Sequence, residues 1–367
     1  MRVRRIALNG FRNYEWETAE FAPGTNVICG PNAQGKTNLL EAVYLLSCGR
    51  SFRTRFDREL IGFGYSEGQI LGEVFSHERD QTVDIRLRAG QTKRITVNGV
   101  KKTAAELSDT VNVVLFCPDD LNLIKEGAAV RRRLLDNAIS QIRPRYAEIL
   151  TEFNRLYEHK TRILRDWREK PGLLDTLDEF SDAMARATAQ LIRYRAAYTA
   201  RLNQAAPPIH RDFSGKGEEL AIAYQTVSSV KDPYASAKEI YYDVCEHQEA
   251  HRQAELDSAQ CLTGAHKDDL DIQINGRSAR SFASQGQTRT AALSMKLAER
   301  EILQAESGEM PVLLLDDVLS ELDRRRQEFV LNRIGGGQTL ITCCEDEEIS
   351  LRTGGRVLLV EKGKIHG

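Results

Sequence analysis

The chain has 367 residues, 41% apolar and 28% charged, and its 51 Lys and Arg against 53 Asp and Glu give a formal net charge of −2. This composition is typical of a globular protein with room for two lobes, and nucleic-acid binding would need local basic patches rather than bulk charge. Because no apolar run approaches a membrane span and Met1–Gly10 lacks a signal-peptide core, we expect a chain that neither spans nor binds a membrane. Seven scattered cysteines without a C-x-x-C pair favour a reducing compartment, so we expect a cytoplasmic protein.

The N-terminal region reads as a series of strands. Arg2–Leu8 has a strand pattern and leads into a turn-prone stretch at Phe11–Tyr14, while Thr25–Cys29 is a short apolar run suited to a buried strand. An antiparallel meander is predicted by three alternating segments, Gly68–Ser76, Thr82–Arg88 and Thr92–Val97. Val111–Phe116 is apolar throughout and predicts another buried strand.

The segment Gly30–Thr37 reads G-P-N-A-Q-G-K-T and fits the phosphate-binding P-loop pattern G-x-x-x-x-G-K-[ST]. Its two glycines let successive N–H groups point at one centre, and the helix expected to begin near Lys36 adds its positive end. Lys36 would reach the β- and γ-phosphates, and the Thr37 hydroxyl would ligate Mg²⁺. The expected phosphate-binding residues are therefore Gly30, Pro31, Asn32, Ala33, Gln34, Gly35, Lys36 and Thr37.

The composition changes after Pro118, and the chain up to about Ala259 has the apolar spacing of helices. We expect several helices rather than one long coiled coil, because the region is divided by Pro144, Pro171-Gly172 and Pro207-Pro208. A small strand at Leu220–Thr226 is also expected.

Alternating strands and helices then resume at Leu270–Ile274, Gln287–Ala305, Met310–Asp317, Asp323–Ile334, Gln338–Thr342 and Arg356–Glu361. The sequence therefore predicts an α/β fold in which both chain ends build one nucleotide-binding lobe, residues 1–117 and 262–367. A mostly helical second lobe, residues 118–261, would be inserted into it.

Two further segments carry chemistry near the C-terminus. An apolar strand delivers Asp316 and Asp317, where the first acid would hold Mg²⁺ through water and the second would orient or deprotonate an attacking water. Ser284-Gln285-Gly286-Gln287 stands just before a helix, where serine and glycine can form an anion site. A solvated acidic turn and an ordinary serine N-cap are the structural alternatives.

In this order the P-loop, the Ser284 segment, the acidic strand and Ser320–Asp323 resemble the motifs of an ABC-type ATPase head. The resemblance implies that ATP is buried between two head-to-tail subunits, with the serine segment of one covering the γ-phosphate bound to the other. It implies catalytic roles for Lys36 and Asp317, roles in trans for Ser284, Gly286 and Gln287, and Mg²⁺ binding by Thr37 and Asp316. Within Phe11–Tyr14, Arg12 and Asn13 would lie beside the adenine, unless this segment only seals the sheet edge.

Within that class the chain resembles the RecF family. The resemblance rests on segments along most of the chain: Asn9–Tyr14, Gly30–Ala42, Ser51–Arg53, Pro118–Leu121, Arg131–Asp136, Gly264–Leu270, Ser284–Arg289 and Leu313–Asp323. It implies an ATP-dependent homodimer that binds single- and double-stranded DNA without sequence preference, at gaps and junctions. It also implies help in loading a recombinase together with RecR- and RecO-like mediators, and weak, DNA-stimulated ATP hydrolysis as a reset.

The chain departs from the patterns of these families at several positions. Ala265 and Lys267 stand where the RecF family usually has proline and arginine, and a lysine cannot replace the planar fork of an arginine. No glutamine follows Val111–Phe116, which leaves Asp119 or Asp120 to act in its place, and no switch histidine follows the strand expected at Gln338–Thr342. Asp317 also replaces the usual glutamate. The last three departures motivate a hypothesis of slow turnover, with ATP acting mainly as a switch.

Other functional classes remain open at this point. A transporter ATPase subunit would have a smaller helical subdomain and a switch histidine, and a chromosome-structuring ATPase would have long coiled coils. A purely ATP-gated clamp without meaningful hydrolysis is a further alternative. Basic runs that could grip DNA phosphates if dimerisation gathers them on one face are Lys101-Lys102, Arg131–Arg133 and Arg324–Arg326, and Arg53 could approach phosphates or DNA.

Overall fold

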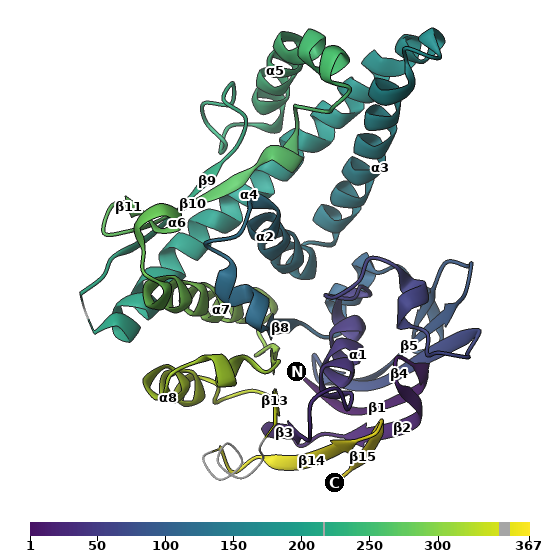
Figure 1. Cartoon of the computed structure of the whole chain (residues 1–367), viewed down its shortest axis with the longest axis vertical. Helices are drawn as coiled ribbons and strands as arrows, with labels where there is room; N and C mark the ends of the chain where they lie inside the picture. Colours follow the sequence, from purple (N-terminus) through teal and green to yellow (C-terminus); the bar gives the residue numbers. More distant parts are fainter. Residues whose placement is uncertain (216, 345–352) are drawn as a thin grey trace. The chain divides into compact units, whose positions relative to one another are not determined.

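The computed structural model describes residues 1–215, 217–344 and 353–367. The chain forms two compact units: Met1–Asn122 together with Ala292–Gly367, and Leu123–Ala291 (Figure 1). Among the described residues, no helix has both the length and the apolar character needed to cross a bilayer.

An antiparallel sheet occupies the N-terminal part of the first unit. Its strands follow the order β2-β1-β4-β5-β6-β7. They are β1 (Arg2–Phe11), β2 (Tyr14–Glu20), β4 (Glu67–Ser76), β5 (Arg79–Arg88), β6 (Arg94–Val97) and β7 (Val100–Lys102). The predicted meander is confirmed. Strand β2 escaped the sequence analysis because exposed Glu15 and Trp16 are adjacent in it and blur the alternation, yet it pairs with β1 from Phe11↔Tyr14 onward.

The second sheet of this unit is mostly parallel and follows the order β15-β14-β3-β13-β12-β8. Its strands are β3 (Thr25–Cys29), β8 (Val113–Phe116), β12 (Val312–Leu315), β13 (Thr339–Cys343), β14 (Arg356–Glu361) and β15 (Lys364–His366). Strand β13 separates β3 from β12 and runs parallel to both. The loops that follow β3 and β12 therefore lie at the same carboxyl edge of the sheet.

Helix α1 (Lys36–Cys48) packs into one core with both sheets. Leu39, Leu40, Val43, Leu45 and Leu46 are all fully buried. A helix that is buried on nearly every side needs no polar face, which explains why α1 shows little amphipathic pattern. The first unit also contains the helix α8 (Arg324–Arg333) and the short 3₁₀ turns η1 (Asp57–Leu60), η2 (Ala105–Asp109), η3 (Pro118–Asn122) and η6 (Val318–Glu321).

The second unit is mostly helical. It contains α2 (Ala128–Ile142), α3 (Pro144–Asp166), η4 (Pro171–Thr176), α4 (Leu177–Ser214), α5 (Ala237–Ser258), η5 (Ala265–Lys267) and α6 (Ala279–Phe282). A small sheet accompanies the helices in the order β11-β10-β9, formed by β9 (Leu220–Gln225), β10 (Asp269–Ile274) and β11 (Arg277–Ser278). Helix α7 (Gln285–Ser307) begins in this unit and ends in the first.

The expected break at Pro207-Pro208 is wrong, because α4 continues through both prolines to Ser214. A proline inside a helix costs roughly 3 kcal/mol, since it removes a backbone hydrogen bond and crowds the preceding turn. Burial of Ala206, Ile209 and Phe213 around the two prolines offsets this cost. Pro144, in contrast, stands at the first position of α3, where proline is favoured.

Residues 262–291, which the sequence analysis places in the nucleotide-binding lobe, belong to the second compact unit. The reason is strand pairing: β10 pairs with β9 along its whole length, from Asp269↔Gln225 to Ile274↔Leu220. Contacts between strands so far apart in the sequence leave no trace in local periodicity.

A buried polar cluster in the second unit is centred on Arg195 of α4, whose side chain is only 2% exposed. Its Nη1 atom lies 2.7 Å from Asp268 Oδ2, and its Nη2 atom lies 2.8 Å from Asp136 Oδ1. The Asp268 carboxylate also accepts hydrogen bonds from Tyr224 and Thr226. The cluster therefore ties the segment before β10 to α2, α4 and β9 through paired charges.

We expect Arg195→Met to lower the free energy of unfolding of this unit by about 3–5 kcal/mol, because it leaves the buried Asp268 carboxylate without its cation. Urea denaturation followed by Trp167 fluorescence in a Trp16→Phe background would measure it, since Trp167 lies in the second unit and Trp16 in the first. The control is Arg186→Met on the same helix, where an exposed pair with Asp182 is worth at most about 1 kcal/mol. Equal effects of the two substitutions would contradict the expectation.

Candidate nucleotide-binding site

The loop between β3 and α1 curves in a way that requires its two glycines. Gly30 has a φ of 142° and Gly35 a φ of 123°. A Cβ atom on Gly30 would lie 2.2 Å from the Val360 carbonyl oxygen, and one on Gly35 would lie 2.8 Å from the Asn13 side chain. Only glycine satisfies both the backbone angles and the space. The loop therefore has the tight curvature that turns backbone N–H groups toward a common centre.

Lys36 opens α1 and is buried. Its Nζ atom donates to the carbonyl oxygens of Gly30 (2.7 Å) and Pro31 (3.0 Å), so the ammonium lies across the loop that precedes it. Gly35, the residue that caps the helix, has no side chain to bind the first N–H groups of α1. Those N–H groups and the ammonium together form an electropositive end suited to phosphate.

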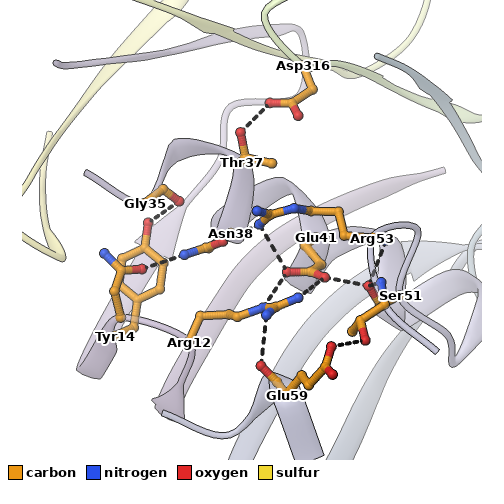
Figure 2. A network of polar contacts seen from close by, with 12 residues as sticks. Arg12, Tyr14, Gly35, Thr37, Asn38, Glu41, Ser51, Arg53, Glu59 and Asp316 are labelled. Carbon is orange, nitrogen blue, oxygen red and sulfur yellow. Dashed lines mark hydrogen bonds and ion pairs between the residues drawn. The ribbon is translucent and has the colours of Figure 1, made fainter. Parts of the chain in front are cut away.

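Asp316 follows β12 and meets Thr37 across the edge of the parallel sheet (Figure 2). The Thr37 hydroxyl donates to Asp316 Oδ1 at 2.9 Å, and the Thr342 hydroxyl donates to the same oxygen at 3.0 Å. Burial raises the pKa of Asp316, against the effect of these two hydrogen bonds. A hydroxyl and a carboxylate at this separation are oxygen ligands of the kind that Mg²⁺ takes when phosphates supply others, so these residues fit the ion.

Asp317 lies beside this pair with an unusual backbone. Its φ of 49° places it in the left-handed region at the start of η6, where its carbonyl oxygen accepts from Ser320 Oγ. Its N–H donates to Thr342 Oγ1 at 2.8 Å. Thr342 thus forms hydrogen bonds to both Asp316 and Asp317.

A buried carboxylate that the sequence analysis missed, Glu41 of α1, organises the other side of the site (Figure 2). Arg12 forms a bidentate ion pair with it, in which Nε donates to Oε2 at 2.8 Å and Nη2 donates to Oε1 at 2.7 Å. The Ser51 hydroxyl also donates to Glu41, and Arg12 Nη1 donates to the Glu59 carbonyl at 2.7 Å. The signal available in the sequence was a lone acid between apolar residues of the helix.

Asn13 and its neighbour Tyr14 brace the P-loop directly. Asn13 Nδ2 donates to the Gln34 carbonyl at 2.8 Å, and Asn13 Oδ1 accepts from Asn38 Nδ2 at 2.8 Å. The Tyr14 hydroxyl donates to the Gly35 carbonyl at 2.9 Å, and burial raises the pKa of Tyr14. Phe11 and Tyr14 are buried in the sheet, while Asn13 contacts the P-loop and Arg12 contacts Glu41 of α1.

The basic loop after α1 joins the same network. Arg53 Nη1 donates to Asn38 Oδ1 at 2.7 Å and lies 3.7 Å from Glu41 Oε2. On the far side of the P-loop, Gln34 Oε1 accepts from the Lys362 N–H, and Asn32 Oδ1 accepts from the Cys344 thiol. Residues that directly follow β13 and β14 therefore hold the loop from one part of the chain, and Asn13 and Tyr14 hold it from the other.

The residues of the predicted serine segment form a separate group in the second unit. Ser284 is exposed just before α7 and exchanges hydrogen bonds with Gln287: Ser284 N donates to Gln287 Oε1 at 2.8 Å, and Gln287 N donates to Ser284 Oγ at 3.3 Å. Gly286 lies in the first turn of the same helix. This is a capping box at the start of α7, where Ser284 and Gln285 are exposed.

The structure limits two candidates from the sequence, the acid expected to replace the missing glutamine and the basic run Arg131–Arg133. Asp120 accepts from the Cys117 backbone N–H at 2.9 Å and so is occupied within its own turn, whereas Asp119 is exposed. The Arg131 side chain is buried, and its Nε atom lies 2.6 Å from Asp269 Oδ1. This member of the basic run is therefore not available to bind DNA phosphates. Arg133 of the same run is exposed.

Comparison with known proteins gives a consistent result. A family model described as the RecF/RecN/SMC N terminal domain matches residues 2–354. The DNA replication and repair protein RecF of Acetivibrio thermocellus is 37% identical over 369 residues, covering 100% of both chains. RecF of Alkaliphilus oremlandii is 38% identical over 371 residues, again covering 100% of both chains.

Solved structures agree with these relatives. The recombination mediator protein RecF-ATPrS in the RecFOR pathway has a TM-score of 0.91 at 33% identity, covering 99% of this chain and 97% of that one. The corresponding RecF-ATP structure has a TM-score of 0.90 at 34% identity, covering 99% and 96%. An Smc head domain from Pyrococcus furiosus, at 15% identity and a TM-score of 0.54, shares the fold. With its P-loop, its acidic strand end and its helical insertion, this chain belongs to the RecF family of ABC-type ATPases.

Proposed function

We propose that this protein is an ATP-driven DNA-repair switch, in which ATP joins two copies head to tail over DNA. The family membership supports a role in DNA replication and repair. The observation that carries the proposal is the contact between Thr37 and Asp316, which brings the P-loop helix and the acidic strand end within one hydrogen bond. That arrangement is suited to a nucleoside triphosphate with Mg²⁺.

Each residue of the site has a proposed role. The Gly30–Thr37 backbone and Lys36 would hold the phosphates, and Thr37 with Asp316 would hold Mg²⁺, Asp316 acting through water. Asp317 would orient or deprotonate the attacking water. Arg12 and Asn13 would line the nucleotide side of the network that braces the loop. When bound, Mg²⁺ would neutralise charge developing on the phosphates.

The serine segment is proposed to act on the nucleotide of a second copy. The exposed start of α7, with Ser284, Gly286 and Gln287, offers a helix N-terminus to a γ-phosphate. ATP would then stabilise only the closed dimer and shift the population toward it. The shorter arm of Asp317 and the Thr342 hydroxyl beside it support slow hydrolysis as the reset, and a turnover number as high as that of a fast transporter ATPase would argue against it.

DNA contacts are proposed to be sequence-tolerant and made through phosphates. The exposed side chains of Arg133 in the second unit and of Arg325 in the first are candidates for such phosphate contacts. Single-strand gaps and duplex–single-strand junctions are the proposed targets, where the dimer would help load a recombinase together with RecR- and RecO-like partners. The names of the relatives with solved structures support this, since they are recombination mediators of the RecFOR pathway.

Two substitutions test the two parts of the proposed composite site, the P-loop of one copy and the serine segment of the other. Lys36→Met is expected to weaken ATP binding at least about tenfold, because the ammonium lies where phosphate charge must be met. Ser284→Arg is expected to keep ATP binding yet prevent ATP-dependent dimerisation, because a long side chain would occupy the place of the partner's phosphate. Isothermal calorimetry for binding and light scattering during size exclusion for mass would test both, and normal dimerisation of Ser284→Arg would exclude the in-trans role.

Asp316→Asn is expected to abolish the Mg²⁺-dependent stabilisation by ATP without lowering the Tm of the ligand-free chain. A raised carboxyl pKa means that the ionised form costs stability at neutral pH, and a neutral amide removes this cost while Oδ1 still accepts from both hydroxyls. Differential scanning fluorimetry with and without Mg²⁺ and ATP measures both quantities.

The wild-type Mg²⁺ effect is also expected to shrink as the pH falls toward the raised pKa of Asp316, because protonation removes the negative charge that would hold the ion through water. The Asp316→Asn variant is the control that should show no such dependence. A Mg²⁺-dependent Tm shift of wild-type size in this variant would contradict the assigned role.

DNA affinity is expected to require ATP and to fall steeply with salt. For duplex DNA the logarithm of the binding constant should fall with the logarithm of salt concentration by about 0.9 for each phosphate contact, with little difference between unrelated sequences. Fluorescence anisotropy at several salt concentrations measures the slope, with Lys36→Met as the control for ATP dependence. Affinity that does not change with salt would contradict phosphate-based binding.

A further inference from the structure

Gln287 uses both ends of its side-chain amide. Its Oε1 atom accepts from the Ser284 N–H at 2.8 Å, and its Nε2 atom donates to Glu218 Oε1 at 2.8 Å. The first bond belongs to the capping box at the start of α7. The second reaches a residue between α4 and β9 that no sequence motif singles out.

Glu218 is itself held in place from the other side. Its Oε2 atom lies 3.1 Å from Nε2 of His210, which is fully buried in α4, while the Glu218 side chain is 22% exposed. A carboxylate only accepts hydrogen bonds, so the Gln287 NH₂ group must face Glu218 and the Gln287 oxygen must face Ser284. The His210 ring must likewise present its Nε2–H. Burial lowers the pKa of His210, which favours this neutral ring.

Loss of the carboxylate would leave the orientation of the Gln287 amide undetermined. A half-turn of the amide would place its NH₂ group against the Ser284 N–H, where two donors face each other and the capping bond is lost. The capping box fixes the backbone of Ser284 and the first turn of α7, so its loss loosens the segment as a whole.

We propose that Glu218 is a positioning residue for the serine segment, acting through Gln287 to hold Ser284 in the geometry that meets the γ-phosphate bound to a second copy. This inference rests on the proposed in-trans role of Ser284. Against this positioning effect, the negative charge of Glu218 near the start of α7 repels an incoming phosphate. The direction of the mutational effect distinguishes positioning from repulsion.

The test compares Glu218→Ala with Glu219→Ala in the full chain. Glu219 is exposed and adjacent, and it joins the small sheet region through backbone bonds to Asn275, so its truncation removes the same charge without touching Gln287. Glu218→Ala is expected to raise the protein concentration for half-maximal ATP-dependent dimerisation about tenfold, the factor expected for one hydrogen bond to a charged group. ATP affinity of the monomer should stay unchanged. An effect no larger than that of Glu219→Ala, or tighter dimerisation, overturns the proposal.

A double-mutant cycle shows whether Glu218 acts through Gln287. In a Gln287→Ala background, Glu218→Ala is expected to have no further effect on dimerisation, because the group that it orients is gone. Full additivity of the two substitutions overturns the proposal. Glu218→Gln, which keeps an accepting oxygen, should recover dimerisation to within about threefold of wild type, and this variant also keeps the test valid if alanine disturbs folding.

Different results would disprove the composite site and the role of Glu218. If Ser284→Arg dimerises normally with ATP, the composite site itself is wrong and Glu218 has nothing to position. If Ser284→Arg fails to dimerise while Glu218→Ala behaves like Glu219→Ala, the composite site stands and only the role of Glu218 is wrong.

Discussion

The carboxylate of Glu41 lies inside the first unit with no exposed surface, and its need for hydrogen-bond partners constrains the segments that surround the P-loop helix. An unpaired carboxylate in such a place would cost several kcal/mol, so Arg12 and Ser51 must stay within hydrogen-bonding distance. Arg12 follows the last residue of β1, and Ser51 lies in the loop after α1. One buried charge therefore fixes the strand, the helix and the loop relative to one another, and the P-loop inherits that rigidity.

The second unit follows the same principle with the signs exchanged. Here the buried group is the Arg195 guanidinium, and the carboxylates of Asp136 and Asp268 come to it from other elements. Buried ion pairs of this kind contribute little net stability compared with apolar packing, but they strongly penalise any arrangement that separates the partners. Each unit is thus held to one packing by a central charge, in addition to its apolar core.

The sequence was sufficient for the elements that local chemistry determines. Strand β3 and the start of α1 were predicted at their observed bounds, because a P-loop imposes strand, turn and helix on adjacent residues. The pairing of β10 with β9 could not be predicted, since it joins strands that are separated in the sequence by the whole of α5. The continuous path of α4 through Pro207 and Pro208 depends in the same way on burial that only the folded unit supplies.

For the site, the sequence identified the residues whose chemistry is visible in a motif. Lys36, Thr37 and Asp316 were predicted, and the structure brings Thr37 and Asp316 into contact. The residues that support the P-loop helix, Glu41, Ser51 and Glu59, were not predicted, because their role depends on folded geometry rather than on a recognisable sequence pattern. Whether Ser284 and Gln287 act on a second copy stays a prediction, since the capping box that they form is also what an ordinary helix start would show.

Thr342 has a consequence of its own. Its hydroxyl spans Asp316 and the backbone of Asp317, the two acids that face the site. An imidazole near this position would gain or lose a proton close to neutral pH, whereas an aliphatic alcohol keeps its single hydrogen throughout the physiological range. Any dependence of this bracing on pH in that range must therefore come from the carboxylates and not from Thr342.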